Sequence, residues 1–412
     1  MSTRTPKMST PSNLDASPPS VLLVDDEPLN LDLLEQELDG SGFEVLTASN
    51  GEQALELVAS SAPDMIFLDL MMPVMDGYSV LERLQQDEVW RSIPVVIISA
   101  ASDLKNIVRA IEMGAVDFLP KPFEPAILQA RLNAGLEKKR LYDLEQRYLL
   151  SLERELEIGR EIQADFLPAV IPQPDGWKIR AHFQAAREVA GDFYDVFDIS
   201  PGQVGLLVGD VTDKGVGSAL YMALYRSLLR ATLLADQLTD DGEAGQCQPP
   251  EDCLLRAVTH VNRYICKFHD SAMFATLFFA VLDTDSGRVC YINAGHDAPY
   301  VLRDHEIVQQ VMPSGPVVGA FESASYEIET FVLEPGDQLV LYSDGIPDAQ
   351  NEDREMFGAQ RLRDLLQAKH GEAHTCFDTV LSEVEAHIGE AIQFDDITLM
   401  VVERMESSSA SN

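Results

Sequence analysis

The first third of this 412-residue chain places chemically active side chains at the ends of short apolar runs. The runs are "VLLV", "IFL", "VVII" and "FLP", and the residues that end or follow them are Asp25, Asp26, Asp69, Ser99 and Lys121. Helical patterns such as "LNLDLLEQEL" and "GEQALELVAS" separate the runs. Strands alternating with helices predict a doubly wound parallel α/β sheet, whose sites gather at the carboxyl ends of the strands. We therefore expect these five side chains to meet.

Three carboxylates held close together repel one another and raise each other's pKa unless a cation lies between them. A site made of oxygen ligands and retained water suits Mg²⁺. Asp69 beside such an ion could accept a phosphoryl group, which Lys121 and the Ser99 hydroxyl would hold. A single aspartate at a strand end more often caps a helix. The agreement of five residues at four strand ends favours an aspartyl-phosphate site.

The C-terminal half contains a second acidic set, again where apolar runs meet glycine-containing turns. Its members are Asp192 in "VAGDFYDVF", Asp210 and Asp213 in "GDVTDKGVG", Asp344 in "LVLYSDGIPDAQ", and Asp395 and Asp396 in "FDDITLMVV". Aspartate beside glycine is commonly turn chemistry. Four motifs of this form favour a site for two Mg²⁺ or Mn²⁺ ions that activate water for attack on phosphorus. The chain has neither a GxSxG nor a Walker-type phosphate motif.

The pattern leaves three assignments open in this second set. The spacing does not decide between Asp395 and Asp396 as the metal ligand. Asp213 could contact a weak third metal or cap the following helix, and we prefer the cap. His296 in "NAGHDAP" could act as an acid on the phosphate side, although a turn histidine is the preferred interpretation. Because the motifs offer aspartates and one histidine, zinc is disfavoured.

The elements around the second set differ from those of the first third. Short apolar runs such as "GLLVGDV", "FATLFFAVLD" and "ITLMVV" are joined by turns such as "DTDSGR", and two long helical patterns cover 218–235 and 250–267. This organisation predicts antiparallel sheets flanked by helices, in an α+β domain. The predicted boundaries are a disordered tail at 1–19, the α/β domain at 20–135, a helical linker at 136–170, the α+β domain at 175–404 and a second tail at 405–412.

The linker pattern indicates one long helix over 126–166. Leu144, Tyr148 and Leu152 recur at a spacing of four residues and form an apolar seam. The seam could pack against the chain's own domains or pair with a second copy in a parallel dimer. We prefer the dimer because the seam is long and flanked by charge.

Composition narrows the class of protein. The formal net charge of −38 argues against nucleic acid as a direct partner, because affinity for nucleic acid depends on cationic residues. The sequence contains no apolar run long enough for a membrane span and no secretory signal at its N-terminus. Five cysteines without a CxxC pair indicate a reduced, cytoplasmic protein.

The first third resembles the response regulator receiver family, on the motifs "VLLVDDEP", "IFLDLMMPVMDG", "VVIISA" and "FLPKPF". The resemblance implies that a sensor histidine kinase phosphorylates Asp69. It also implies that Mg²⁺ binds Asp26, Asp69 and the Met71 carbonyl, with Asp25 acting through water. Ser99 and Phe118 fall on the family's switch positions.

The C-terminal half resembles the PPM-type protein phosphatases, in the branch that regulates sporulation and sigma factors. The motifs are "VAGDFYDVF", "GDVTDKGVGSALYMA", "INAGHDAPYVL", "GDQLVLYSDGIPDAQN" and "DDITLMVV". The resemblance implies that Asp210 bridges two metals, with further ligands at the Val211 carbonyl, Asp344 and Asp395. Asp192 matches the residue that holds metal-bound waters. Relatives often carry glycine or histidine where Asp213 and Lys214 stand.

These patterns together predict a response regulator whose output is a metal-dependent phosphoserine or phosphothreonine phosphatase. The resemblance implies a phosphorylated anti-sigma-factor antagonist, or a similar phosphoprotein, as substrate. The alternative is a non-catalytic adaptor that binds a sigma factor or its regulators. The complete acidic set favours the enzyme. A nucleotide cyclase is disfavoured because its glycine and acid signature is missing.

Overall fold

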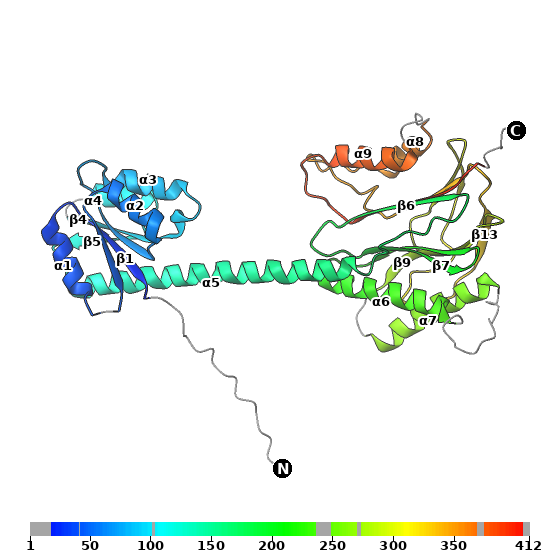
Figure 1. Cartoon of the computed structure of the whole chain (residues 1–412), viewed down its shortest axis with the longest axis horizontal. Helices are drawn as coiled ribbons and strands as arrows, with labels where there is room; N and C mark the ends of the chain where they lie inside the picture. Colours follow the sequence, from blue (N-terminus) through cyan, green and yellow to red (C-terminus); the bar gives the residue numbers. More distant parts are fainter. Residues whose placement is uncertain are drawn as a thin grey trace, which may run out of the picture. The chain divides into compact units, whose positions relative to one another are not determined.

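The computed structural model describes residues 18–40, 42–100, 104–235, 249–269, 273–368 and 375–406. The chain divides into two compact units, Met1–Leu152 and Glu153–Asn412, and each is described by itself. Figure 1 traces both units in sequence colours. The tails predicted to be disordered lie almost entirely outside the described residues, as does Cys247.

The first unit contains a five-stranded parallel sheet with the strand order β2-β1-β3-β4-β5. Its strands are β1 (Ser20–Val24), β2 (Glu44–Ala48), β3 (Met65–Asp69), β4 (Val95–Ala100) and β5 (Asp117–Lys121). Its helices are α1 (Pro28–Leu38), α2 (Gly51–Ser61), α3 (Gly77–Gln86), η1 (Trp90–Ser92), α4 (Leu104–Glu112) and the start of α5 (Pro125–Ala164). The predicted doubly wound fold is confirmed.

Apolar residues alternate between the two faces of this sheet. Leu22, Ile66 and Ile97 pack into the core under α2, α3 and α4. Their chain neighbours Leu23 and Phe67 pack into the opposite core, which contains residues of α1 and α5. Because both faces are covered, the central strands β1, β3 and β4 are almost entirely apolar, as expected for a parallel sheet, whereas the edge strands β2 and β5 carry polar residues. Side-chain caps fix two helix starts: Asn50 accepts the Gln53 amide proton of α2, and Asp76 accepts that of Ser79 in α3.

The second unit contains two five-stranded sheets, ordered β13-β10-β9-β8-β7 and β12-β11-β14-β15-β6. All the strand pairs within them are antiparallel. The first sheet consists of β7 (Asp192–Ser200), β8 (Gln203–Val211), β9 (Ala275–Asp283), β10 (Arg288–Ala294) and β13 (Glu329–Val332). The second consists of β6 (Trp177–Gln184), β11 (Tyr300–Arg303), β12 (Glu306–Gln310), β14 (Gln338–Tyr342) and β15 (Ile397–Arg404).

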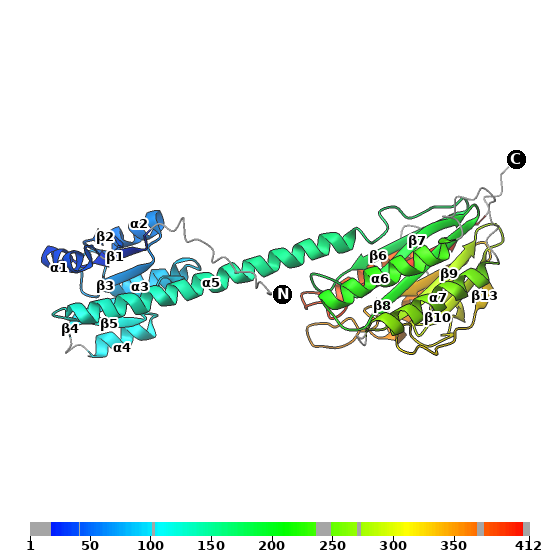
Figure 2. The same cartoon turned by 90° about the horizontal axis from the view of Figure 1, so that it is seen from below.

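Helices cover the outer faces of this pair of sheets. Helices α6 (Val216–Leu233) and α7 (Pro250–Phe268) lie across the first sheet, as Figures 1 and 2 show. Helices α8 (Ala359–Leu366) and α9 (Cys376–Ile388) cover the second sheet. A third core between the sheets contains Tyr194, Phe278 and Met400. The prediction of antiparallel sheets flanked by helices is confirmed.

Helix α5 contributes residues to both units. Leu128 and Leu132 are fully buried in the core of the first unit. Further along the same helix, Leu144 and Tyr148 of the predicted seam are 57% and 67% exposed. Within the described residues, no helix combines the length and apolar character that spanning a membrane would require.

Candidate functional site

In the first unit, three carboxylates converge at the carboxyl ends of β1 and β3. Ligand oxygens of Asp25, Asp26 and Asp69 all lie within 4.8 Å of one another. Asp25 and Asp69 are buried, whereas Asp26 is exposed. Within the described ranges, no other group of three or more acidic, histidine or cysteine side chains is as tight. The predicted meeting of the three carboxylates is what the fold produces.

A lysine from β5 completes this cluster. The Lys121 Nζ lies 2.9 Å from Asp25 Oδ2 and 3.2 Å from Asp69 Oδ1. The Asn30 amide of α1 donates hydrogen bonds of 3.0 and 3.1 Å to the two oxygens of Asp25. Burial raises the pKa of Asp69, Lys121 opposes the rise, and the Asp25 carboxylate adds to it. Asp69 therefore has a lysine partner and still experiences uncompensated negative charge.

The other predicted residues of this unit lie on neighbouring elements. Ser99 is buried near the end of β4, where it pairs in register with Pro120 of β5. Phe118 is half-buried on β5. Met71 follows β3 and its side chain is 71% exposed. These positions allow the predicted roles, which depend on a phosphoryl group and an ion.

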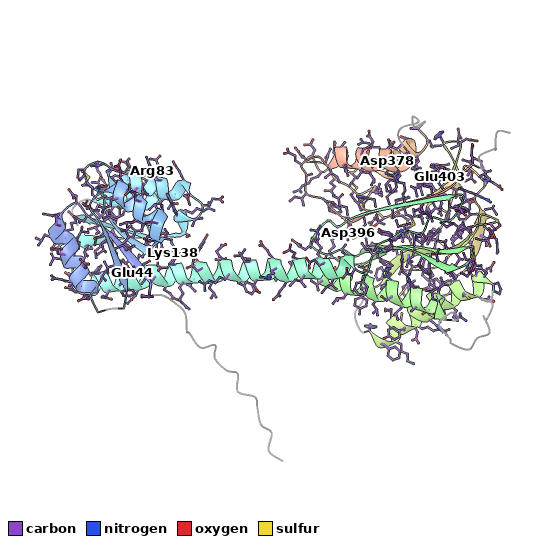
Figure 3. The ribbon with its side chains drawn as sticks, viewed as in Figure 1. Glu44, Arg83, Lys138, Asp378, Asp396 and Glu403 are labelled. Atoms are coloured by element: carbon purple, nitrogen blue, oxygen red, sulfur yellow. The ribbon has the colours of Figure 1, made fainter. Side chains whose placement is uncertain are left out.

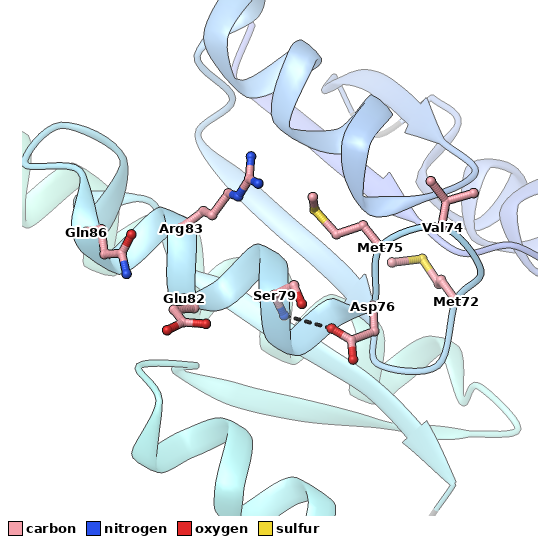
Figure 4. Close-up of a pocket in the computed structure, with 8 residues that line it drawn as sticks. All are labelled: Met72, Val74, Met75, Asp76, Ser79, Glu82, Arg83 and Gln86. Carbon is pink, nitrogen blue, oxygen red and sulfur yellow. Dashed lines mark hydrogen bonds between the residues drawn. The ribbon is translucent and has the colours of Figure 1, made fainter.

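An open hollow of about 680 Å³ is bordered by the loop after β3 and by α3 (Figure 4). It is lined by Met72, Val74, Met75, Asp76, Ser79, Glu82, Arg83 and Gln86. Asp76 accepts a 2.8 Å hydrogen bond from the Ser79 amide and so caps α3. None of the predicted phosphoryl-transfer residues lines this hollow.

In the second unit, strand register brings the first two aspartates together. The antiparallel pairing of β7 with β8 sets Asp192 directly opposite Asp210. Gly191, just before Asp192, has no room for a side chain: an added Cβ would lie 2.7 Å from the Val211 carbonyl oxygen and 3.4 Å from Asp210 Oδ1. This glycine lets two chain segments approach at the site.

The second sheet supplies the remaining aspartates. Asp344 follows β14, and Asp395 and Asp396 precede β15, its neighbour in the sheet. The Thr398 hydroxyl of β15 donates a 2.6 Å hydrogen bond to Asp192 Oδ2 on β7. That bond joins the two sheets at the acidic site. The structure therefore brings together all four motifs that the sequence singled out.

Burial and mutual repulsion raise the pKa values of these carboxyl groups. For Asp192, which is 1% exposed, burial and then Asp210 raise the pKa well above its usual range. Burial, Asp344 and Asp395 raise the pKa of Asp210 to about 7. Burial and Asp395 raise that of Asp344 to about 6. A set of carboxylates that resist ionisation in this way is suited to a bound cation.

Two family models match the chain. The model of stage II sporulation protein E matches residues 200–405, and that of the response regulator receiver domain matches residues 21–133. The first match covers half of the 412 residues. The chain belongs to the stage II sporulation protein E family. Its first unit carries the receiver domain, so the resemblance drawn from the sequence motifs is confirmed for both regions.

Individual relatives cover parts of this family member. Protein IcfG from Synechocystis sp. is 38% identical over 273 residues, which are 61% of this chain and 41% of that protein. Response regulator PleD from Caulobacter vibrioides is 42% identical over 123 residues, which are 30% of this chain and 27% of that protein. The SiaA-PP2C domain of Pseudomonas aeruginosa is 21% identical with a TM-score of 0.49, covering 63% of this chain and 99% of that one. The chain spans less than half the length of both curated relatives.

In this member of the stage II sporulation protein E family, Asp395 and Asp396 have different surroundings. Asp396 is buried, and its two oxygens accept 2.8 Å hydrogen bonds from the Ala186 and Gly191 amides. Figure 3 shows it at the opposite end of β15 from Glu403. Asp395 instead lines a hollow of about 430 Å³ together with Asp210. Asp396 thus holds the segment before Asp192, while Asp395 faces the hollow.

The interpretation of Asp213 as a helix cap is wrong. The cap position of α6 belongs to Gly215, and no side chain accepts a hydrogen bond there. Asp213 lies two residues earlier with a φ of +74°, in the left-handed region that aspartate tolerates better than most residues. Its exposed side chain lines the same hollow as Asp210 and Asp395.

His296 lies in the loop after β10 and is 3% exposed. Its Nδ1 lies 2.9 Å from the Thr276 hydroxyl, and burial lowers its pKa to about 4. The ring is therefore neutral near pH 7, and it does not line the hollow beside Asp210. This environment agrees with the preferred interpretation of a structural loop histidine.

Several side chains at the site were not predicted to belong to it. Thr398 holds Asp192, Gln163 of α5 bonds the backbone of Ala190, and Arg187 lines the hollow. Thr398 is far along the chain from Asp192, and Gln163 and Arg187 lie in segments that carry no recognisable motif. Sequence patterns therefore did not connect them with the site. The only signal in the sequence was that Thr398 interrupts the apolar pattern of β15.

Proposed function

We propose that this protein is a response regulator in which phosphorylation of Asp69 controls a metal-dependent phosphoserine or phosphothreonine protein phosphatase. The observation that carries the proposal is the acidic cluster built from two sheets, with Asp192 opposite Asp210 on one and Asp344 and Asp395 on the other. The cluster borders a hollow that also contains Arg187 and Lys214. The family match to stage II sporulation protein E supports the same reaction class.

The residues present fit a pair of Mg²⁺ or Mn²⁺ ions. Asp210, Asp344, Asp395 and the Val211 carbonyl would hold them, and Asp192 would hold their waters. Every donor in this set is oxygen, which suits Mg²⁺ and Mn²⁺ better than zinc. The raised pKa values of Asp210 and Asp344 indicate negative charge that a cation would compensate. When bound, such ions supply the positive charge that activates water and stabilises the phosphoryl group.

The chain's own residues position this set. Thr398 fixes one oxygen of Asp192, and Asp396 fixes the backbone at Ala186 and Gly191. The Arg187 side chain is exposed at the hollow. Its guanidinium would bind the phosphoryl oxygens of a substrate and orient the phosphorus toward the acidic cluster.

In the receiver domain, Asp69 would accept a phosphoryl group from a sensor histidine kinase. Mg²⁺ would be held by Asp26, Asp69 and the Met71 carbonyl, with Asp25 acting through water. Lys121 already contacts Asp69 and would neutralise the incoming phosphoryl oxygens. The Ser99 hydroxyl would turn toward that group, and Phe118 would respond as the aromatic switch.

Partners follow from this assignment. The substrate would be a phosphorylated anti-sigma-factor antagonist or a similar phosphoprotein, and the protein would act in the cytoplasm. The exposed side chains of Leu144, Tyr148 and Leu152 on α5 support a homodimer through that helix. The strongly negative net charge supports partners other than nucleic acid or anionic membrane surfaces.

The test uses purified full-length protein with Mn²⁺. It measures hydrolysis of p-nitrophenyl phosphate and of a phosphoserine protein, with and without beryllofluoride as a phosphoryl mimic. We expect turnover that requires metal, falls at least about a hundredfold in Asp210→Asn, and changes with beryllofluoride in wild type but not in Asp69→Asn. Absence of turnover on both substrates, with binding of a sigma-factor regulator retained, would establish the adaptor instead.

A further inference from the structure

Lys214 makes close contacts with the segment that carries Asp395. Its Nζ lies 2.8 Å from Asp395 Oδ2 and donates a 2.9 Å hydrogen bond to the Phe394 carbonyl. The same Nζ lies 4.8 Å from the centroid of the Phe394 ring. The Lys214 side chain is 34% exposed and that of Asp395 is 25% exposed, so water screens this pair only partly. The ammonium group thus contacts two consecutive residues, Phe394 and Asp395, at the proposed metal site.

Both oxygens of Asp395 are already engaged. Oδ1 accepts a 2.9 Å hydrogen bond from the Asp396 amide, and Oδ2 pairs with Lys214. Among the residues that the structure describes, Asp210 and Asp344 form no ion pair with a lysine or arginine. Within the described part of the chain, Asp395 is therefore the one of these three candidate ligands that forms a direct ion pair, while the Lys214 charge at longer range only opposes the rise in the pKa of Asp344.

The backbone around Lys214 fixes its direction. Asp213 and Gly215 on either side both have positive φ, +74° and +96°. Lys214 therefore lies in an irregular loop rather than in a regular element. The loop lies between β8, which carries Asp210, and the start of α6. Its position explains how a residue so close in sequence to Asp210 reaches across the hollow to Asp395.

We propose that the Lys214 ammonium is a tethered cation that competes with a divalent ion for Asp395. The inference rests on the proposed metal site. Mg²⁺ and Mn²⁺ bind oxygen at about 2.1 Å, so an ion on Asp395 Oδ2 would lie within about 5 Å of the ammonium. Like charges at that separation repel, so the ion must displace Lys214 or share the oxygen with it at a cost. The ion at Asp395 is then the more weakly held of the two, and Lys214 sets its occupancy.

The test is a Mn²⁺ titration of the full chain, with free Mn²⁺ followed by its paramagnetic resonance signal. All proteins carry Asp69→Asn to weaken the receiver's metal site. Lys214→Met keeps the length of the side chain and removes its charge, and Lys214→Gln is a second variant in case the first folds poorly. We expect both to bind the weaker Mn²⁺ roughly three- to tenfold more tightly, the scale of a partly exposed ion pair.

Two controls make the result specific. Arg187→Met removes a positive charge from the same hollow and leaves the Lys214–Asp395 ion pair in place. Its Mn²⁺ affinity should stay within about twofold of the parent protein. In an Asp395→Asn background, Lys214→Met should no longer tighten Mn²⁺ binding, because the contested oxygen has lost its charge.

Four results separate the possible failures. Unchanged Mn²⁺ affinity in both Lys214 variants would overturn the competition, and weaker affinity would show that Lys214 positions Asp395 for the ion. If Arg187→Met tightens Mn²⁺ binding as much as the Lys214 variants do, the effect comes from the total positive charge in the hollow and not from the contact between Lys214 and Asp395. If the parent protein binds no Mn²⁺ beyond the receiver site, the proposed metal-dependent phosphatase itself fails.

Discussion

The Gln163 side chain is hydrogen-bonded at two points to the backbone of Ala190. Its Nε2 donates to the Ala190 carbonyl at 2.6 Å, and its Oε1 accepts the Ala190 amide proton at 3.0 Å. Gln163 is 7% exposed and Ala190 is 1% exposed. Ala190 lies two residues before Asp192, so α5 is attached directly to the segment that forms the acidic site.

Replacing Gln163 by leucine should weaken both the second unit and its site. The change leaves a buried amide and a buried carbonyl at Ala190 without partners, at about 1–3 kcal/mol each. We expect lower stability of the second unit in urea, a lower kcat, and a smaller response to beryllofluoride. Gln163→Glu keeps the acceptor for the Ala190 amide but, when ionised, sets an oxygen against the Ala190 carbonyl, so it should lose less stability than leucine only at low pH, where its protonated carboxyl group can donate to that carbonyl. If the leucine variant keeps the wild-type kcat and the full response to beryllofluoride, the contact between α5 and Ala190 plays no part in controlling the site.

Thr398 should matter through its hydroxyl alone. Thr398→Val keeps the shape of the side chain but removes the 2.6 Å hydrogen bond to the buried Asp192 carboxyl group. We expect a loss of about 1–3 kcal/mol in the free energy of unfolding, together with a lower kcat. Thr398→Ser restores the donor and should recover most of the kcat. If serine is as impaired as valine, the methyl group rather than the hydrogen bond is responsible.

The receiver site was predictable because its signals are local. Each residue of that site ends a short apolar strand, and parallel topology places all the carboxyl ends at one edge. Asp25, Asp69 and Lys121 therefore meet wherever those strands form. The three residues are unevenly spaced in the sequence, but each stands at the carboxyl end of its strand.

The acidic site of the second unit was predictable only as a set of motifs. Which aspartate faces the hollow depends on β15 register and on amides at Ala186 and Gly191, about 200 residues away from Asp396 in sequence. Strands β6, β12 and β13 and helices α8 and α9 were not predicted, because their sequences are mixed in polarity. The cap assigned to Asp213 was wrong because the cap position of α6 belongs to Gly215, which has no side chain to accept a hydrogen bond.

Gly191 should tolerate no side chain. In Gly191→Ala the new methyl group would lie 2.7 Å from the Val211 carbonyl oxygen and 3.4 Å from Asp210 Oδ1, so β7 or β8 must shift. We expect a loss of about 1–3 kcal/mol in stability and a weaker Mn²⁺ affinity. Gly159→Ala, within α5, is the matched control. Its methyl group would meet only the Val189 side chain, at an ordinary contact distance of 3.6 Å. That variant should gain about 0.5–1 kcal/mol. Equal behaviour of the two alanine variants would exclude the contact at Val211 as the cause.

The metal-free second unit should lose stability as pH rises from 5 to 8. Asp210 and Asp344 have pKa values raised to about 7 and about 6, above their value of 3.8 in an unfolded chain. The folded state therefore holds their protons more tightly. This contribution is fully present below the unfolded pKa and disappears as pH passes through the folded values.

Calorimetry of the full chain in EDTA can isolate this effect by comparing wild type with Asp210→Asn/Asp344→Asn. We expect the melting temperature of the wild-type second unit to fall by at least about 5 °C over this range relative to the double variant. His296, whose pKa is lowered to about 4 by burial, acts in the opposite direction but equally in both proteins, so the difference cancels it. Mn²⁺ at pH 8 should restore the wild-type transition and leave the double variant unmoved, because the ion compensates the charge that protons compensate at low pH. Parallel pH profiles for the two proteins would show that these carboxyl groups titrate as they do in an unfolded chain.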